Sequence, residues 1–325
     1  MKKGQLLYLS QQDVADLQIQ MEEIILLVEK AFHEKGNGKI EMPPKPGIHP
    51  GGGDNFIHAM PAYIPAMRSA GVKWVSGFPE NNKKGLPYIT GLLIFNDVDT
   101  GVPLAVMDCV WITAVRTGAA TAVAAKHLAR SDASVAGVLG CGTQGYTNVQ
   151  ALREVLLIEM VKAYDIDPER ANVYREKIEA DFDLPTTIVD TPREAVSGCD
   201  LVVTAGPIQK QPHQTIQAGW MDSGAFASLV DFDSYWHPGA LHEMDKFCTD
   251  DIDQLLHYQE VGYFQDIPDV YADLGELVVG KNPGRENDNE RNCTANLGLA
   301  IDDMAVAPLV YQRAIDLGIG QWLEL

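Results

Sequence analysis

The chain has 325 residues, of which 46% are hydrophobic and 22% are charged, and its formal net charge at pH 7 is −20. These proportions are ordinary for a globular protein and argue against a fibrous, disordered or membrane-spanning chain. Because domains average about 150 residues, the length predicts two of them. The acidic excess repels phosphate backbones and no basic stripe offsets it, so we predict no nucleic-acid partner.

The first ten residues hold two lysines and a short apolar run, which is neither a signal peptide nor a spanning helix. We therefore expect a cytoplasmic protein with no membrane contact. Five cysteines are scattered singly, and His49, His58 and His237 share no ligand spacing, so no disulfide framework or metal site is expected.

In the first third of the chain, helical spacing of apolar residues predicts a helix over 11–35, and prolines and glycines predict a loop over 43–53. Residues 56–59, 70–77 and 91–106 are typical of strands. The last of these folds back at 97–101, where Asp and Gly favour a turn, so antiparallel pairing is expected.

Beyond residue 110 the pattern changes to an Ala-rich helix over 113–129 and then to alternating strands and helices, which is typical of a parallel α/β sheet. The expected strands are 134–139, 160–164, 186–189, 201–204 and 225–230. Thr191, Pro192 and Glu194 form a capping-box signature at a helix start. A last helix is expected over 296–315, packed back on the first part of the chain.

A glycine-rich loop follows the expected strand 134–139 directly and precedes a helix. Its glycines, Gly140, Gly142 and Gly145, have the G-x-G-x-x-G spacing that lets a pyrophosphate approach a helix N-terminus. Together with Thr143 and Gln144, they are the predicted contacts of a dinucleotide.

Asp165 lies twenty residues beyond the last of these glycines, at the end of the second expected strand. A carboxylate there accepts hydrogen bonds from the adenosine ribose and repels a 2'-phosphate, while Ile166 offers no compensating cation. The sequence thus favours NAD(H) over its phosphorylated form as the cofactor.

Several motifs in a fixed order resemble the ornithine cyclodeaminase and mu-crystallin family, and the resemblance covers nearly the whole chain. Besides the glycine loop they are Gly71-Val-Lys73-Trp-Val-Ser-Gly77-Phe-Pro79-Glu-Asn81, Thr90, Asp97-Val98-Asp99-Thr100-Gly101, Thr113-Ala-Val-Arg116-Thr117, Ala163-Tyr-Asp165-Ile-Asp167-Pro168 and Leu297-Gly298-Leu-Ala-Ile301-Asp302-Asp303.

The resemblance implies an α/β fold, with a Rossmann dinucleotide-binding domain over 116–302 and an α+β substrate-binding and dimerisation domain over 1–115 with 303–325. It implies a homodimer. It also implies that Lys45 and Arg116 bind a substrate carboxylate, that Lys73 and Asp233 are catalytic, and that Thr90 and Thr117 contribute to the cofactor site.

These roles are chemically sensible, since an arginine fork suits a carboxylate and an aspartate after a parallel strand can exchange a proton. Alternatives stay open from the residues alone. Lys73 could be an exposed strand lysine and Arg116 could pair with surface acids. Asp231 competes with Asp233 for the catalytic place, and register favours Asp233.

Two departures from the family pattern bear on the substrate. His58 stands where cyclodeaminases place a glutamate that holds an ammonium, and Lys45 stands in place of an arginine. We reason that both cations disfavour a second ammonium and favour a small anionic amino or imino acid. The hypothesis is an NAD(H)-dependent amino-acid dehydrogenase or imine (ketimine) reductase, with alanine-type, iminosuccinate-type and cyclic ketimine substrates open. The alternatives are a cyclodeaminase-type lyase and a non-catalytic nucleotide-binding protein.

Overall fold

A computed structural model describes residues 4–325, apart from the side chain of Asn82. The chain forms two compact units. The first unit is Met1–Arg116 with Leu299–Leu325, and the second unit is Thr117–Gly298. The expected ranges assigned Arg116 and residues 299–302 to the middle of the chain. The structure assigns them to the first unit, because residues 300–302 begin a helix that packs on its sheet.

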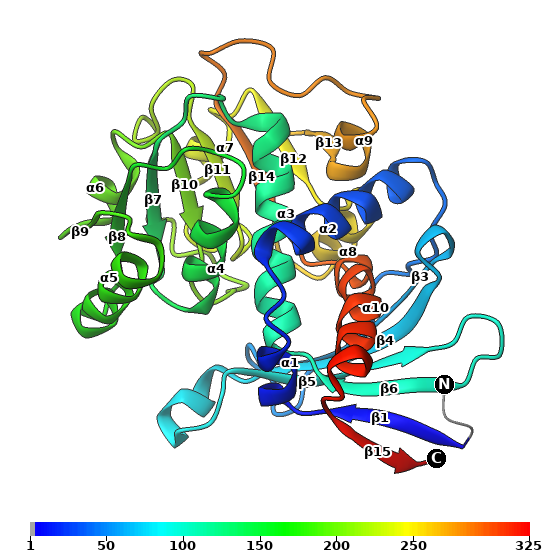
Figure 1. Cartoon of the computed structure of the whole chain (residues 1–325). Helices are drawn as coiled ribbons and strands as arrows, with labels where there is room; N and C mark the ends of the chain where they lie inside the picture. The colour runs from blue at the N-terminus through cyan, green and yellow to red at the C-terminus, as the bar shows by residue number, and fades with distance from the viewer. Residues whose placement is uncertain (1–3) are drawn as a thin grey trace. The chain divides into compact units, whose positions relative to one another are not determined.

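The first unit contains a seven-stranded mixed sheet in the order β15-β1-β6-β5-β4-β3-β2 (Figure 1). The strands are β1 (Gln5–Leu9), β2 (Gly47–Ile48), β3 (Phe56–Ile64), β4 (Ser69–Gly77), β5 (Ile89–Asn96), β6 (Pro103–Asp108) and β15 (Gln321–Glu324). β1 pairs with β6 in parallel, and the other neighbours are antiparallel. The predicted antiparallel strands and the turn at 97–101 are confirmed.

One face of this sheet is covered by α10 (Ala300–Leu317), on which α2 (Met21–Gly36) packs (Figure 1). The Ser69 hydroxyl donates to the carbonyl of Met304 over 2.5 Å, which ties β4 to the helix. The predicted last helix is therefore confirmed, including its return to the first part of the chain. The opposite face keeps Trp74 and Leu92 49% and 45% exposed.

The single helix expected over 11–35 is wrong. Two helices form, α1 (Gln11–Asp16) and α2, because the chain reverses at Gln18, whose φ is 50°. Each has its own N-terminal carboxylate cap, since the Asp13 side chain accepts from the Ser10 N–H and the Glu23 side chain from the Gln20 N–H. The expected loop 43–53 contains the two-residue strand β2.

The second unit contains an eight-stranded parallel sheet in the order β13-β12-β14-β11-β10-β7-β8-β9. The strands are β7 (Val135–Leu139), β8 (Met160–Tyr164), β9 (Thr186–Ile188), β10 (Leu201–Thr204), β11 (Phe226–Leu229), β12 (Lys246–Thr249), β13 (Val270–Asp273) and β14 (Asn292–Ala295). The run β9-β8-β7-β10-β11 has the first five positions of the Rossmann order, 3-2-1-4-5, and β14, β12 and β13 extend the sheet beyond β11. This confirms the predicted fold class.

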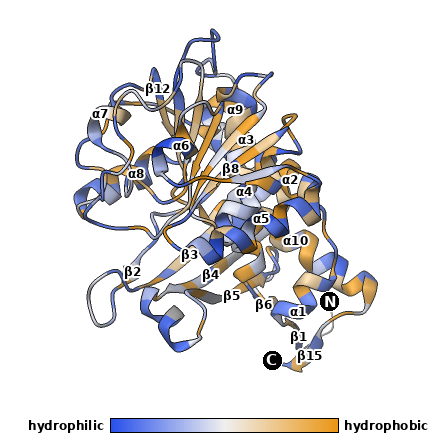
Figure 2. Cartoon of the chain, turned by 90° about the vertical axis from the view of Figure 1, so that its left-hand side faces the viewer, coloured by the Kyte–Doolittle hydropathy of each residue, from blue (hydrophilic) through white to orange (hydrophobic). Residues whose placement is uncertain are grey.

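Helices connect these strands, and within this unit the hydrophobic colour concentrates on strands at its centre (Figure 2). The helices are α3 (Val110–Leu128), shared with the first unit, α4 (Thr143–Leu152), α5 (Pro168–Phe182), α6 (Pro192–Val196), α7 (Pro238–Leu241), α8 (Ile252–Glu260) and α9 (Leu274–Val278). At the predicted cap, the Thr191 side chain accepts from the Glu194 N–H, but the Glu194 carboxylate accepts from Asp190 rather than closing a box on Thr191. No helix within residues 4–325 is long and apolar enough to cross a bilayer.

Candidate active site

The glycine-rich loop after β7 needs each of its three glycines for a different reason. Gly140 has a φ of 103°, and a Cβ there would lie 2.6 Å from the carbonyl oxygen of Ala205. A Cβ on Gly145 would lie 2.3 Å from the carbonyl oxygen of Gly140, so this glycine lets α4 pack closely on the loop. Gly142 has open space around it.

The open position at Gly142 is also the N-cap of α4, and no side chain caps its N–H groups. Thr143 and Gln144 form the first turn, with Thr143 exposed and Gln144 half-buried. A helix N-terminus with unclaimed N–H groups attracts a phosphate, and a residue without a side chain lets the phosphate come close. The loop therefore fits the pyrophosphate of a dinucleotide.

Asp165 lies at the end of β8, as the sequence predicts, and its side chain also stabilises the glycine loop. One carboxylate oxygen accepts the N–H of Cys141 over 2.8 Å, and the other accepts the N–H of Asp167 over 2.9 Å. The side chain is half-buried, and Ile166 beside it is exposed. Each oxygen keeps a lone pair with which a ribose hydroxyl can bond.

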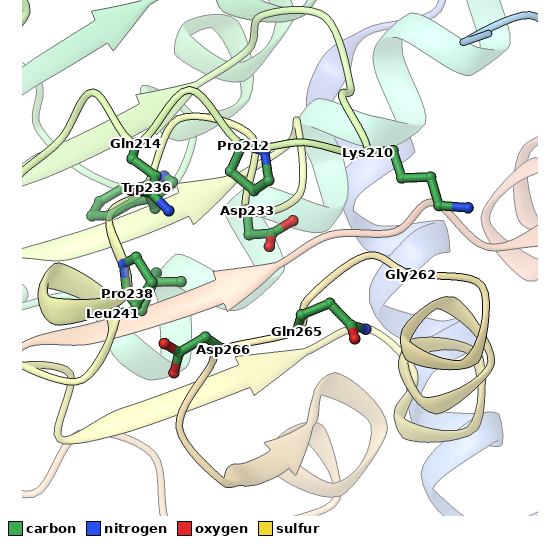
Figure 3. Close-up of a pocket in the computed structure, with 10 residues that line it drawn as sticks. All are labelled: Lys210, Pro212, Gln214, Asp233, Trp236, Pro238, Leu241, Gly262, Gln265 and Asp266. Carbon is green, nitrogen blue, oxygen red and sulfur yellow. The ribbon is translucent and has the colours of Figure 1, made fainter.

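Asp233 contributes its carboxylate to a pocket of about 420 Å³ in the second unit (Figure 3). The residue is 6% exposed, and its Oδ1 is buried without a hydrogen-bond partner in the part of the chain that is described. Burial raises the pKa of Asp233 to about 6. A carboxyl group with this pKa can both accept and release a proton near neutral pH.

In the first unit, four charged side chains meet at the face of the sheet that α10 covers. The Nζ of Lys73 on β4 lies 2.6 Å from Oδ2 of Asp303 and 3.3 Å from the hydroxyl of Thr113. The Nε of Arg116 lies 3.5 Å from Asp303, and its Nη1 lies 3.6 Å from Asp302. All four residues are buried, which excludes the exposed-lysine and surface-pair alternatives for Lys73 and Arg116.

Asp302 and Asp303 were not assigned a role from the sequence, although they lie in one of the quoted motifs. The available signal was a pair of acids followed by the apolar run Met304–Val306, in a helix whose neighbours are buried. Buried carboxylates require cationic or hydrogen-bonding partners, so such a pair predicts buried cations nearby.

His58 lies on β3 opposite Gly47, where a Cβ would come within 2.4 Å of its ring, and it stacks on Phe56. Burial first, and then the charges of Lys45, His49 and Lys73, lower the pKa of His58 to about 3. The imidazole is therefore neutral at neutral pH. The expectation that His58 repels an ammonium through its own charge is wrong, because burial and then the surrounding cations suppress that charge.

The other predicted residues fall in different places. Lys45 is buried in the segment before β2. Thr117 is buried in α3, within the second unit. Thr90 is exposed on β5, where it pairs with Ser76 and lies on the sheet face opposite Lys73. Within the first unit, the structure thus gathers the cations but does not bring Thr90 to them.

Comparison with known proteins agrees with this architecture. The chain is 39% identical to an alanine dehydrogenase of Archaeoglobus fulgidus, over 98% of each sequence. Its fold matches the Δ1-pyrroline-2-carboxylate reductase of Thermococcus litoralis in complex with NADH and L-proline, with a TM-score of 0.91, 35% identity and coverage of 97% and 99%. It also matches an archaeal alanine dehydrogenase dimer with bound NAD, with a TM-score of 0.88, 35% identity and 99% coverage of both chains.

The family model for ornithine cyclodeaminase and mu-crystallin matches residues 6–317, which span both units. The chain belongs to the ornithine cyclodeaminase/mu-crystallin family.

Proposed function

We propose that this protein is an NAD(H)-dependent oxidoreductase that interconverts a small α-imino acid and the corresponding α-amino acid. The observation that carries the proposal is the set of buried cations in the first unit: Lys45 and Lys73 add to the effect of burial in lowering the pKa of His58, and Arg116 lies beside Lys73. A site with this charge suits an anionic substrate and is unfavourable for a side-chain ammonium.

In this proposal, Arg116 and Lys45 bind the substrate carboxylate and orient its α-carbon. A dinucleotide held by the second unit would supply or accept the hydride at that carbon. The glycine loop, Thr143 and Gln144 would hold the pyrophosphate and Asp165 would hold the ribose, while Thr90 and Thr117 are assigned to the cofactor by resemblance alone.

Proton transfer is assigned to Asp233 and Lys73. Asp233 has a pKa of about 6, so it exchanges a proton with the nitrogen or with water near neutral pH. Burial lowers the pKa of Lys73, against the opposing effect of Asp303. A lysine with a lowered pKa can donate a proton to the substrate nitrogen and take it back.

The substrate class follows from the relatives and from the charge of the site together. The similar proteins act on alanine or on a cyclic imine related to proline, and both substrates have a carboxylate and a neutral side chain. We therefore propose pyruvate with ammonia, or a small cyclic imine, as the substrates to be reduced. His58 offers a neutral ring, rather than a carboxylate, to the substrate side chain.

The test is a screen of the purified protein for NADH consumption. Pyruvate, oxaloacetate and glyoxylate are each supplied with ammonia, cyclic imino acids are supplied alone, and ornithine with NAD is run beside them. Steady NADH oxidation with one of the imino or oxo acids is expected. Ammonia release from ornithine with no change in NADH would mean a cyclodeaminase, and NADH binding without any turnover would mean a non-catalytic protein.

We also propose a homodimer that forms through the open face of the sheet in the first unit. Trp74, Leu92 and Leu323 are exposed there and lie on one side of the sheet, and exposed apolar residues on one face favour an interface with another chain. A similar alanine dehydrogenase is a dimer. The five cysteines are buried free thiols, which supports a reducing compartment such as the cytoplasm.

A further inference from the structure

The turn that follows β11 contains two buried aspartates with different partners. Asp231 is 1% exposed, and its two carboxylate oxygens accept the hydroxyl of Thr204 over 2.6 Å and the N–H of Gly206 over 2.8 Å. Asp233 lies two residues later and has an oxygen without a hydrogen-bond partner among the described residues. Of these two aspartates, only Asp233 lines the pocket (Figure 3).

The bonds of Asp231 join two neighbouring strands at their carboxyl ends. Thr204 is the last residue of β10, and its hydroxyl oxygen also accepts the indole N–H of Trp236 over 3.2 Å. The main-chain carbonyl of Asp231 accepts the hydroxyl of Ser234. Ligands of Rossmann sheets bind at the carboxyl ends of the strands, so this network lies at the edge that a dinucleotide uses.

Phe232, between the two aspartates, has a φ of 62°, in the left-handed region that a residue with a bulky side chain rarely occupies. This conformation is unfavourable for a residue other than glycine and persists only where its surroundings enforce it. The ring is buried with its centroid 4.8 Å from that of Tyr258, 5.5 Å from Tyr263 and 5.1 Å from Phe264. The reversal at Phe232 directs the two carboxylates to different partners.

We propose that Asp231 is a positioning residue for proton transfer by Asp233. Its two hydrogen bonds fix the turn against the end of β10, the aromatic cluster holds the reversal at Phe232, and Asp233 is thereby aimed into the pocket. Asp231 does not itself exchange a proton with substrate, because both of its oxygens are directed at Thr204 and Gly206. The inference rests on the proposed function, and it assigns a role to a carboxylate that the reaction does not use directly.

Three variants test it, with kcat, KM for the imino acid and Kd for NADH measured for each. Asp231→Ala removes both hydrogen bonds and is expected to lower kcat on the order of 10- to 100-fold, as a misplaced catalytic group does. KM and the NADH Kd are expected to stay within about threefold. Asp231→Asn keeps an oxygen for the Gly206 N–H and is expected to restore kcat to within about fivefold of the wild type.

The third variant, Thr204→Val, removes the hydroxyl that donates to Asp231 while leaving the aspartate in place. It should lower kcat less than Asp231→Ala does, again with KM unchanged. It also keeps the test decisive should the Asp231→Ala chain fail to fold, because unchanged kcat in a folded Thr204→Val protein overturns the proposal.

Asp200→Ala is the matched control. Asp200 precedes β10 and accepts the N–H groups of Ser134 and Val135 at the amino end of β7, away from the proposed cofactor edge. Its loss should lower Tm without changing kcat. An active wild type whose Asp231→Ala variant keeps its kcat, or loses NADH affinity instead, contradicts this inference alone. A wild type that turns over none of the substrates contradicts the proposed function and removes the inference with it.

Discussion

At the scale of single residues, burial decides which charges the protein can use. Lys73, Arg116, Asp302 and Asp303 lie together almost without solvent, and each would be costly to bury alone. Together they balance, with two positive and two negative side chains, and the excess of positive charge comes from the buried Lys45, which acts on His58 together with Lys73. An incoming carboxylate therefore meets cations that are already held in place, which limits the entropy lost on binding.

The role of Arg116 is tested by Arg116→Ala. We expect KM to rise and kcat to fall together, with a loss in kcat/KM on the order of 2 to 4 kcal/mol, because the same contact binds the carboxylate and orients the α-carbon. Arg116→Lys should recover only part of this, since lysine lacks the planar fork. Steady-state kinetics measure both variants, with Arg68→Ala as the control because Arg68 forms an exposed pair with Asp99. Normal kinetics in Arg116→Ala would remove Arg116 from the site.

The buried acid Asp231 predicts a dependence of stability on pH. Burial raises the pKa of Asp231 from 3.8 to about 7, so folding favours its protonated form. The resulting stabilisation is fully present below pH 3.8 and is lost as the pH rises through about 7. Between pH 5 and 8 the wild type should lose roughly 2 kcal/mol of unfolding free energy relative to Asp231→Asn. Urea unfolding at the two pH values measures this, and a constant difference between the two proteins would contradict the raised pKa.

At the scale of elements, β7, the glycine-rich loop and α4 form one structural motif. β7 is followed by Gly140, which has a positive φ. Gly142 leaves open space at the N-terminus of α4, and Gly145 lets α4 pack closely on the loop. Asp165 at the end of β8 completes this arrangement through its bond to Cys141. Cofactor affinity and local stability therefore depend on different glycines of the same motif.

Two alanine substitutions separate these contributions. Gly142→Ala adds a methyl group into open space at a φ of −96°, so Tm should be nearly unchanged while NADH affinity falls by about tenfold or more, because the methyl group occupies the place of the pyrophosphate. Gly145→Ala places its methyl group 2.3 Å from the Gly140 carbonyl oxygen and should lower Tm by several degrees. NADH fluorescence titration and thermal unfolding measure the two effects. Equal NADH affinity in the Gly142→Ala protein and the wild type would contradict the cofactor assignment.

At the scale of the whole molecule, the two units have sheets of different kinds. In the parallel sheet of the second unit, β10, β11, β12 and β14 are buried along their whole length, as strands covered on both faces are. α10 packs on one face of the mixed sheet of the first unit, and Trp74 and Leu92 on the opposite face are 49% and 45% exposed. The uncovered face of that sheet is the reason to expect a second copy of the chain.

The proposed dimer is tested by Trp74→Lys on this open face. Trp74 is 49% exposed, so the substitution should leave the fold of a single chain intact while placing charge within the proposed interface. Light scattering after gel filtration should give the mass of a dimer for the wild type and that of a monomer for the variant. Leu157→Lys, at an exposed leucine of the second unit, is the control and should stay dimeric. A dimeric Trp74→Lys protein would move the interface elsewhere.

The sequence alone determined the elements whose signals are local. Alternation and turn residues predicted β3 to β6, and the glycine spacing between β7 and α4 predicted the Rossmann loop, because each signal lies within a few adjacent residues. Strand β14 was missed since Asn292 and Thr294 make it look polar. In the fold, Asn292 donates to the carbonyl of Leu128 and Thr294 donates to Asn296.

Only the tertiary structure decided the charge states and partners of the candidate site. Lys73 and Asp303 lie far apart in the sequence and become an ion pair only when α10 returns to the sheet. Asp231 and Asp233 are the same residue type two positions apart, and the hydrogen bonds to β10 and the reversal at Phe232 distinguish them. A pKa depends on burial and on neighbouring charges, and neither is fixed until segments distant in the chain come together.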